Sequence, residues 1–240
     1  ELYHAVNDAL TDAAERDDLA VVVVTGAGRA FSAGQDLGEM ARLGNRARRE
    51  PGDASTSAEG HGFASFMSTL LTYPKPLIAA VNGLAVGLGL TMLAHCDLVL
   101  VADDARLRAP FVSLGVVPEA ASSALLPAVM GWQAAAHAFF TASWIDAQRA
   151  VDTGIAWARF PNEKLVDEAL ELAHTIAAMP LVSLVRTKAL IRAARGPLIE
   201  DARRREDAEF ADLTGGPANR EAIAAFLEKR EPDFTRLPSE

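Results

Sequence analysis

The chain has 240 residues, a net charge of −9 and 50% hydrophobic residues, and its length fits one large domain or a core with an appendage. The acidic balance argues against a nucleic-acid partner, and no uninterrupted apolar run is long enough to span a membrane. A single cysteine, Cys96, excludes an intrachain disulfide and fits a reducing compartment, so we expect a cytoplasmic protein. The Ala- and Arg-rich composition is typical of a bacterial source.

The first part of the chain alternates between helix and strand patterns. "ELYHAVNDALTDAAER" has a helical pattern already under way at its first residue, so we expect the natural chain to begin upstream. "LAVVVVTGAG" (19–28) is a continuous β-branched run and predicts a strand buried on both faces. "PLIAAVNG" (76–83) and "DLVLVADD" (97–104) predict two more strands, and a helix is expected to start in "VGLGLTMLAHC" (86–96). This alternation predicts an α/β fold.

Two long segments depart from the alternation. Residues 38–74 are polar, with "REPGDASTSAEGHG" at their centre, and predict a loop of the kind that forms lids or binding segments. After Pro161 only helical patterns remain. We therefore expect a β/α core over residues 1–161 and a helical segment over residues 162–240.

The glycines after the first predicted strand do not form a dinucleotide-binding fingerprint. In "VVVVTGAGRAFSAGQD", Phe31 stands where the third glycine of that motif should be. No acidic residue ends a following strand about 20 residues later, where a ribose would be held. We therefore set this interpretation aside.

We interpret three further patterns as structural. The five histidines have no metal-ligand spacing, so no metal site is expected. His95 and Cys96 are adjacent on a predicted helix and should point apart, which favours a core or surface role for His95. The basic run 203–205 is flanked by acidic residues, Glu206 among them, and predicts a solvated helix face with i,i+4 ion pairs.

Four stretches together resemble the crotonase superfamily, the enoyl-CoA hydratase/isomerase family, over essentially the whole chain. They are "GRAFSAGQDL" (28–37), "KPLIAAVNGLAVGLGLTMLAHCDLVLVADDARLRAP" (75–110), "LGVVPEAASS" (114–123) and "AIAAFLEKREPDF" (222–234). The resemblance implies a spiral β/α core, a C-terminal helical segment that packs between subunits, and a homotrimer or hexamer. It also implies that about 20 residues of a β-hairpin precede Glu1.

The resemblance further implies an acyl-CoA thioester as substrate, with no cofactor. In this family two backbone N–H groups stabilise an enolate-like oxyanion, and the matching amides here are those of Gln35 and Leu88. The family's glycine triplet reads Gly87-Leu88-Gly89 in this chain, a departure that a backbone donor tolerates. Leu88 also opens a predicted helix, where free N–H groups favour negative charge. The other residues implied in binding the substrate or its CoA are Ala33, Gly34, Asp36, Leu37, Phe111, Leu114, Phe226 and Lys229.

The two glutamates that hydratases of this family use are both absent. Thr91 stands at the position of the first and Phe111 at that of the second. A threonine hydroxyl is not a base near neutral pH, and a phenyl ring displaces the water that hydration needs. Hydration by the two-carboxylate route is therefore not expected.

Glu119 is the single charged residue in "APFVSLGVVPEAASSALLPAVMGW" (109–132). Its stretch, Pro-Glu-Ala-Ala-Ser-Ser, resembles the Pro-Glu-Gly-x-Ser-Ser of peroxisomal-type Δ3,Δ2-enoyl-CoA isomerases, with Ala120 in place of glycine. We therefore predict an isomerase in which Glu119 carries a proton from C2 to C4 of a 3-enoyl thioester, helped by a pKa raised by its apolar setting.

Three alternatives remain open at this stage. Glu119 could be an acid in the first turn of a helix. The chain could catalyse another thioester reaction through the same oxyanion hole, including residual hydration. It could also be a non-catalytic protein that binds CoA esters.

Overall fold

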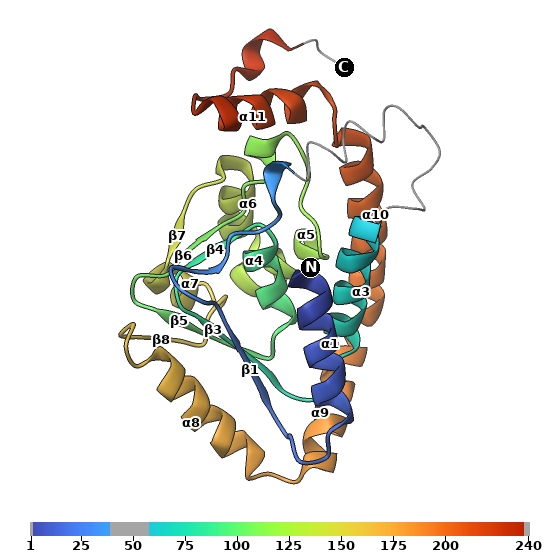
Figure 1. Ribbon diagram of the computed structural model, residues 1–240, viewed down its shortest axis with the longest axis vertical. Coiled ribbons are helices and arrows are strands. Elements are labelled where there is room, and N and C mark those ends of the chain that lie inside the picture. Colours follow the sequence, from blue (N-terminus) through green and yellow to red (C-terminus); the bar gives the residue numbers. More distant parts are fainter. Residues whose placement is uncertain (1, 39–57, 238–240) are drawn as a thin grey trace.

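The computed structural model describes residues 2–38 and 58–237 of the chain. These residues form two four-stranded sheets with helices around them (Figure 1). The strands of the first sheet, in their spatial order, are β1 Val22–Thr25, β3 Leu77–Val81, β5 Leu98–Ala102 and β8 Ala158–Phe160. Those of the second are β2 Ala30–Ser32, β4 Leu84–Val86, β6 Arg106–Arg108 and β7 Ile145–Asp146.

From β1 to β6 successive strands alternate between the two sheets, so each turn of the chain adds one strand to both; β7 then joins β6 in the second sheet, and β8 returns to the first. All neighbours in the first sheet are parallel, and in the second only the β6–β7 pair is antiparallel. The strand after the Gly26 turn is β2 and not a helix, which agrees with setting the dinucleotide fingerprint aside. This path confirms the predicted α/β class with a spiral core.

The strands differ in burial according to their place in the first sheet. Every residue of β3 is buried, because strands flank it on both sides and α8 (Leu165–Ala177) packs against it. The prediction that β1 is buried on both faces is confirmed in part. Val23 packs against the main core cluster and Val22 and Val24 pack against the second one, but all three are only partly buried and Thr25 is exposed. Among the described strands β1 pairs with β3 alone, so it lies at an edge of the sheet.

A helix occupies part of the segment predicted as a loop. α3 (Ala58–Thr72) packs against α1 (Leu2–Glu15), the predicted first helix, and buries Phe66 and Met67. The rings of Tyr3 and Phe66 stack with centroids 5.8 Å apart. The loop prediction is therefore wrong for residues 58–72, and residues 39–57 lie outside the described part of the chain.

Helices make up the rest of the fold, as predicted for the end of the chain. In the described residues after β8, no further strand occurs. The shorter helical elements are α4 Leu88–Thr91, η1 Met92–His95, η2 Val112–Leu114, α7 Ala147–Asp152 and η3 Phe234–Arg236. The longer ones are α5 Ser122–Met130, α6 Trp132–Thr141, α9 Leu181–Ala193, α10 Gly196–Leu213 and α11 Pro217–Glu228.

The C-terminal helices cover different parts of the core. α8 contacts β1, β3 and β5, and its Leu165 and Ala169 belong to the main hydrophobic core, so packing continues across residue 161. α10 packs against α5, and α11 lies across the top of the molecule next to η2 (Figure 1). No single helix in the described part of the chain is both long and apolar enough to cross a membrane; the pair α8–α9 passes that test only together, with a bend of 104°.

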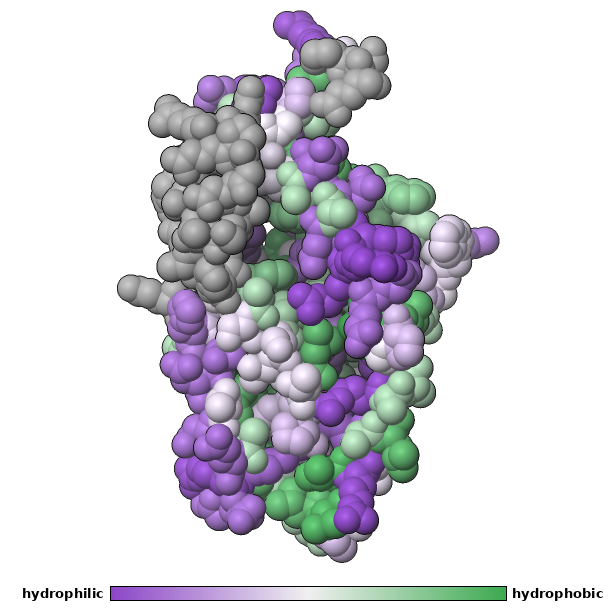
Figure 2. Space-filling view, turned by 90° about the vertical axis from the view of Figure 1, so that its right-hand side faces the viewer, coloured by the Kyte–Doolittle hydropathy of each residue, from purple (hydrophilic) through white to green (hydrophobic). Residues whose placement is uncertain are grey.

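Apolar side chains are exposed on α9. Val182, Leu190 and Ile191 are 64%, 76% and 62% exposed. Figure 2 shows hydrophobic residues gathered at the lower end of the molecule, the end at which α8 and α9 lie in Figure 1. This surface is available for contact with another protein chain.

Lys188 links α9, by hydrogen bonds, to the residues just before β3 and β5 of the first sheet. Its Nζ donates to the carbonyl oxygen of Lys75 at 2.8 Å and to Oδ2 of Asp97 at 2.7 Å. The same Asp97 oxygen accepts the N–H of Leu77 at 2.7 Å. Because Lys188 is only 9% exposed, these bonds replace most of its contact with water.

We expect Lys188→Met to destabilise the protein by about 2 kcal/mol, because it leaves the Asp97 carboxylate without its charged partner. Urea unfolding followed by circular dichroism measures this change. The matched control is Arg186→Met, an exposed position on the same helix, which should change stability by less than about 0.5 kcal/mol. Equal effects of the two substitutions would refute the role given to Lys188.

Candidate active site

A cavity of about 1100 Å³ lies where loops of both sheets meet the C-terminal helices. Nearly all of the site residues predicted from the sequence line it; they are Ala33, Gly34, Gln35, Asp36, Leu37, Leu88, Phe111, Leu114, Glu119 and Phe226. Lys229 is not among the lining residues; it is exposed at the C-terminal end of α11 with φ 55°. Its neighbour Arg230 lines the cavity instead.

Two glycines let the segments that carry the Gln35 and Leu88 amides approach each other. Gly34 has φ +83°, and a Cβ there would lie 2.7 Å from the carbonyl oxygen of Val86. A Cβ on Gly89 would lie 2.5 Å from the carbonyl oxygen of Ser32. Only glycine permits so close a backbone contact at these two positions.

The Leu88 amide opens α4, with Gly87 at φ 56° as the preceding cap residue. The first N–H groups of a helix have no acceptor within the helix. Among the hydrogen bonds between described residues, none uses the N–H of Leu88 or of Gln35. Both residues line the cavity, so an anionic oxygen of a ligand could be held between two free main-chain donors.

The Glu119 carboxyl group is mostly shielded from water. Its Oε1 accepts a hydrogen bond from the Thr91 hydroxyl at 2.6 Å, and its Oε2 is buried without a hydrogen-bond partner among the described residues. Burial raises the pKa of Glu119 to about 7, while the bond from Thr91 works against that rise. The nearby carboxylates of Glu206 and Asp207 raise the pKa further, and Arg203 opposes them. Glu119 can therefore both accept and donate a proton near neutral pH.

Glu119 does not belong to a helix. α5 begins at Ser122, after Ala121 as its cap residue, and has no acidic residue in its first turn. The alternative in which Glu119 is a first-turn acid is therefore wrong. The intervening residues, Ala120 and Ala121, both have left-handed backbones with φ of 60° and 59°.

The residues at the expected positions of the hydratase glutamates occupy the same site. Thr91 is fully buried and bonds Glu119. Phe111 is 5% exposed and lines the cavity. Thr91 and Phe111 thus stand where the carboxyl groups of a hydratase are expected. Among the described residues that line the cavity, Glu119 is the shielded carboxyl group.

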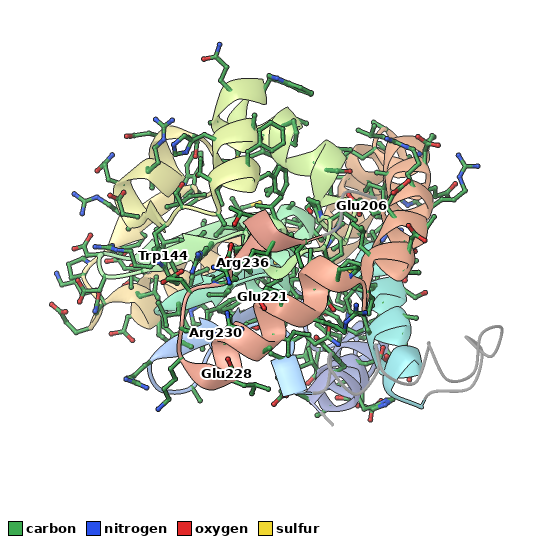
Figure 3. All side chains as sticks on the ribbon, turned by 90° about the horizontal axis from the view of Figure 1, so that it is seen from above. Trp144, Glu206, Glu221, Glu228, Arg230 and Arg236 are labelled. Atoms are coloured by element: carbon green, nitrogen blue, oxygen red, sulfur yellow. The ribbon has the colours of Figure 1, made fainter. Side chains whose placement is uncertain are left out.

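Sequence reasoning found only part of the contribution of the C-terminal helices to the cavity, since of the two tail residues it named, Phe226 lines the cavity and Lys229 does not. The lining residues from this part of the chain are Asp207, Phe210, Ala211, Ala222, Phe226, Leu227, Arg230, Glu231 and Pro232. Arg230 pairs with Glu221 at 2.5 Å and with Glu228 at 2.6 Å, as can be followed along α11 in Figure 3. The motif in residues 222–234 marked this tail as functional, but a helical pattern alone does not tell where a helix packs.

The interpretation of the basic run 203–205 is confirmed in part. Arg204 and Arg205 both pair with Asp201. Glu206, in contrast, is only 5% exposed and does not belong to the solvated face. In the described part of the chain, no group of three or more His, Cys, Asp or Glu side chains could hold a metal ion.

The chain belongs to the enoyl-CoA hydratase/isomerase family, whose sequence pattern matches residues 1–237. It is 34% identical to 1,2-epoxyphenylacetyl-CoA isomerase of Escherichia coli K12, over 92% of this chain and 83% of that protein. It is 33% identical to 2,3-dehydroadipyl-CoA hydratase of the same organism, over 97% of this chain and 87% of that protein.

The fold is similar to the crystal structure of an enoyl-CoA hydratase/isomerase from Pseudoalteromonas atlantica T6c. The TM-score is 0.86 at 35% identity, over 98% of this chain and 89% of that one. The chain is thus an acyl-CoA enzyme of this family. Because its relatives include both a hydratase and an isomerase by name, the particular reaction has to be argued from the site.

Proposed function

We propose that this enzyme moves the double bond of an enoyl-CoA from position 3 to position 2, with Glu119 as the single acid/base. The observation that carries the proposal is the state of the Glu119 carboxyl group. It is shielded, its Oε2 has no hydrogen-bond partner within residues 2–38 and 58–237, and burial raises its pKa to about 7. Glu119 lines the same cavity as Gln35 and Leu88, whose amides are the proposed oxyanion donors. The likeness of residues 118–123 to the peroxisomal-type isomerases supports the same reaction.

The reaction needs one group that moves a proton in both directions. Ionised Glu119 takes a proton from C2 of a 3-enoyl thioester, and the electrons move into a dienolate whose oxygen is held by the amides of Gln35 and Leu88. The protonated carboxyl group then delivers the proton to C4, which leaves the double bond between C2 and C3 and restores the carboxylate. A pKa near neutrality suits both steps, and oriented amide donors stabilise the oxyanion without reorganisation.

Hydration is the second candidate, favoured by the likeness to 2,3-dehydroadipyl-CoA hydratase. It requires a water molecule and a second acid/base group. Thr91 donates its hydroxyl to Glu119, and Phe111 places a ring on the cavity wall where a carboxylate would act. These two side chains favour isomerisation over hydration.

We also propose, from the family resemblance, that the enzyme is a cytoplasmic homotrimer or hexamer without a cofactor and that Lys229 contacts CoA. The exposed Val182, Leu190 and Ile191 of α9 support association, since such side chains are usually covered. Lys229 follows Phe226, which lines the cavity on the same helix.

Incubation with trans-3-hexenoyl-CoA tests the proposal, because conjugation of the double bond with the thioester adds an ultraviolet absorbance that the 3-enoyl ester lacks. We expect conversion to the 2-enoyl ester with no 3-hydroxyacyl-CoA in the products. Hydration of trans-2-hexenoyl-CoA without isomerisation would support the second candidate. Tight CoA-ester binding with no turnover of either ester would leave only the binding-protein alternative.

The hydrogen bond from Thr91 to Glu119 leads to a prediction about how kcat/KM depends on pH. Because Glu119 must be ionised to take the C2 proton, kcat/KM should rise with pH through about 7. Thr91→Val removes the donor that lowers the pKa of Glu119, so the rise should move upward by about 0.5–1 pH unit. Thr153→Val is the control, since that hydroxyl bonds the Arg149 carbonyl and not Glu119. An unmoved or lowered midpoint in Thr91→Val would count against Glu119 as the titrating base.

A further inference from the structure

Two side chains, the buried Glu206 and the partly buried His95, bind the peptide unit that joins Ala120 to Ala121, one residue after Glu119. The carbonyl oxygen of Ala120 lies 2.7 Å from Nε2 of His95, and the N–H of Ala121 donates to Oε2 of Glu206 at 2.6 Å. These two groups are the two ends of one peptide bond. His95 comes from η1 and Glu206 from α10, so distant parts of the chain fix the orientation of this single unit.

Glu206 also holds the start of α5. Its Oε1 accepts the N–H of Ser123 at 2.8 Å, so each carboxyl oxygen bonds one of the free donors at the helix start. Figure 3 places Glu206 on α10, away from the charged cluster of Glu221, Glu228 and Arg230 on α11. A carboxylate with both oxygens engaged matches this pair of donors, and a side chain with one acceptor oxygen would satisfy only one of them.

His95 completes the arrangement in its neutral form. Burial lowers its pKa to about 4, so the ring is uncharged near neutral pH. Since a carbonyl oxygen only accepts, Nε2 must carry the proton in the bond to Ala120. The ring therefore acts as a fixed donor.

The segment needs such support because its backbone is strained. Left-handed alanines at positions 120 and 121 cost about 1–2 kcal/mol each, and such conformations persist only where their surroundings hold them. Because Ala120 is bonded directly to Glu119, a turn of the pinned Ala120–Ala121 peptide would shift the main chain at Glu119 and with it the position of the Glu119 carboxyl group. Among the described residues, no hydrogen bond to Oε2 of Glu119 fixes this end of the carboxyl group.

We propose that Glu206 and His95 are positioning residues, which aim the Glu119 carboxyl group at the substrate by pinning the Ala120–Ala121 peptide at both ends. This inference rests on the proposed function of Glu119 as the acid/base. Neither residue lines the cavity, and both act through the Ala120–Ala121 peptide, one residue after Glu119. Glu206 has a second effect through its charge, because it is one of the groups that raise the pKa of Glu119, together with Asp207 and against Arg203 and Thr91.

The test is Glu206→Gln, which keeps the size of the side chain but offers one acceptor oxygen. We expect kcat for isomerisation to fall about 10–100-fold, as for a catalytic group displaced by a fraction of an ångström to 1 Å, with KM changed less than about threefold. The matched control is Glu209→Gln, an exposed glutamate one turn further along α10, which should leave kcat and KM unchanged. Wild-type kcat in Glu206→Gln would overturn the proposal.

A second readout does not depend on turnover. Carboxyl ¹³C NMR of glutamate-labelled protein, assigned with Glu119→Gln, follows the titration of Glu119 directly. Its midpoint should fall in Glu206→Gln, because a neighbouring negative charge is removed, and stay in place in Glu209→Gln. An unchanged midpoint would refute the coupling. If the wild type does not isomerise the substrate at all, the proposed function fails, whereas this titration still decides whether Glu206 acts on Glu119.

If Glu206→Gln does not fold, two variants of His95, which bonds the carbonyl end of the same peptide, test the proposal independently. His95→Gln retains an N–H donor for Ala120 and is expected to keep kcat within about threefold, whereas His95→Leu removes the donor and should lose about tenfold or more. Equal kcat in the two variants would overturn the role of His95 as a donor to this peptide.

Discussion

Glu119→Gln is expected to lower kcat for the isomerisation of trans-3-hexenoyl-CoA by about 10³-fold, within the range typical of a lost general acid/base. Glutamine has nearly the same shape and still accepts the hydroxyl of Thr91, but it cannot take a proton from C2 or return one to C4. The side chain is shielded and its Oε2 has no partner among the described residues, so the substitution disturbs few other contacts. Affinity for CoA esters should therefore change little.

Stopped-flow absorbance measures the rate, and calorimetric titration with a saturated acyl-CoA measures the affinity. Glu163→Gln, an exposed glutamate far along the chain, is the control and should behave as wild type. A Glu119→Gln enzyme with full activity would mean that another group is the base.

Leu88→Pro is expected to lower kcat by about 10²–10³-fold, the cost of removing one oxyanion donor. Proline deletes the N–H that we assign to the thioester oxygen. It is tolerated at the first position of a helix because that N–H has no partner in the helix, and Leu88 is the first residue of α4. KM should change much less than kcat, because the donor binds the developing oxyanion more strongly than the neutral thioester.

Trp132→Pro is the matched control for this change. Trp132 is also the first residue of a helix, α6, and also follows a glycine of positive φ, Gly131. It is 77% exposed and does not line the cavity. Circular dichroism confirms that both variants fold, and equal activity in both would show that the Leu88 amide is not needed.

Much of the core could be predicted because its signals are local. The apolar runs that became β3 and β5 combine β-branched residues with a turn at the end, and continuous runs of this kind are typical of parallel strands whose two faces are both covered. The glycines at 34 and 89 are equally informative, since each is required by a close backbone contact. The isolation of Glu119 in an apolar run likewise marked it as a candidate for chemistry, although the run alone left open an acid at the start of a helix.

The predictions that failed, wholly or in part, concern features set by distant packing. The segment of α3 contains glycines and few charges, and it is helical because Phe66 and Met67 pack in a cluster with Leu10 of α1. The partial burial of β1 reflects its place at a sheet edge, which its own composition does not reveal. Intrinsic propensity is a weak guide where tertiary contacts decide.

Glu206 illustrates the same limit within the site. Its sequence neighbours are charged and solvated, and its partners, the amides of Ala121 and Ser123, lie more than 80 residues away in the chain. Thr91 and Glu119 are 28 residues apart and meet only because α4 and the segment before α5 border one cavity. A sequence can show that a buried polar group needs a hydrogen-bond partner, but it does not show which residue is that partner.

The most direct test of the whole account is a crystal structure with acetoacetyl-CoA, whose enolate resembles the proposed intermediate. The account predicts the thioester oxygen at about 2.7–3.1 Å from the backbone nitrogens of both Gln35 and Leu88, and a Glu119 carboxyl oxygen within about 3.5 Å of C2. A thioester oxygen bound to neither amide, or a Glu119 carboxyl group turned away from the acyl chain, would contradict it.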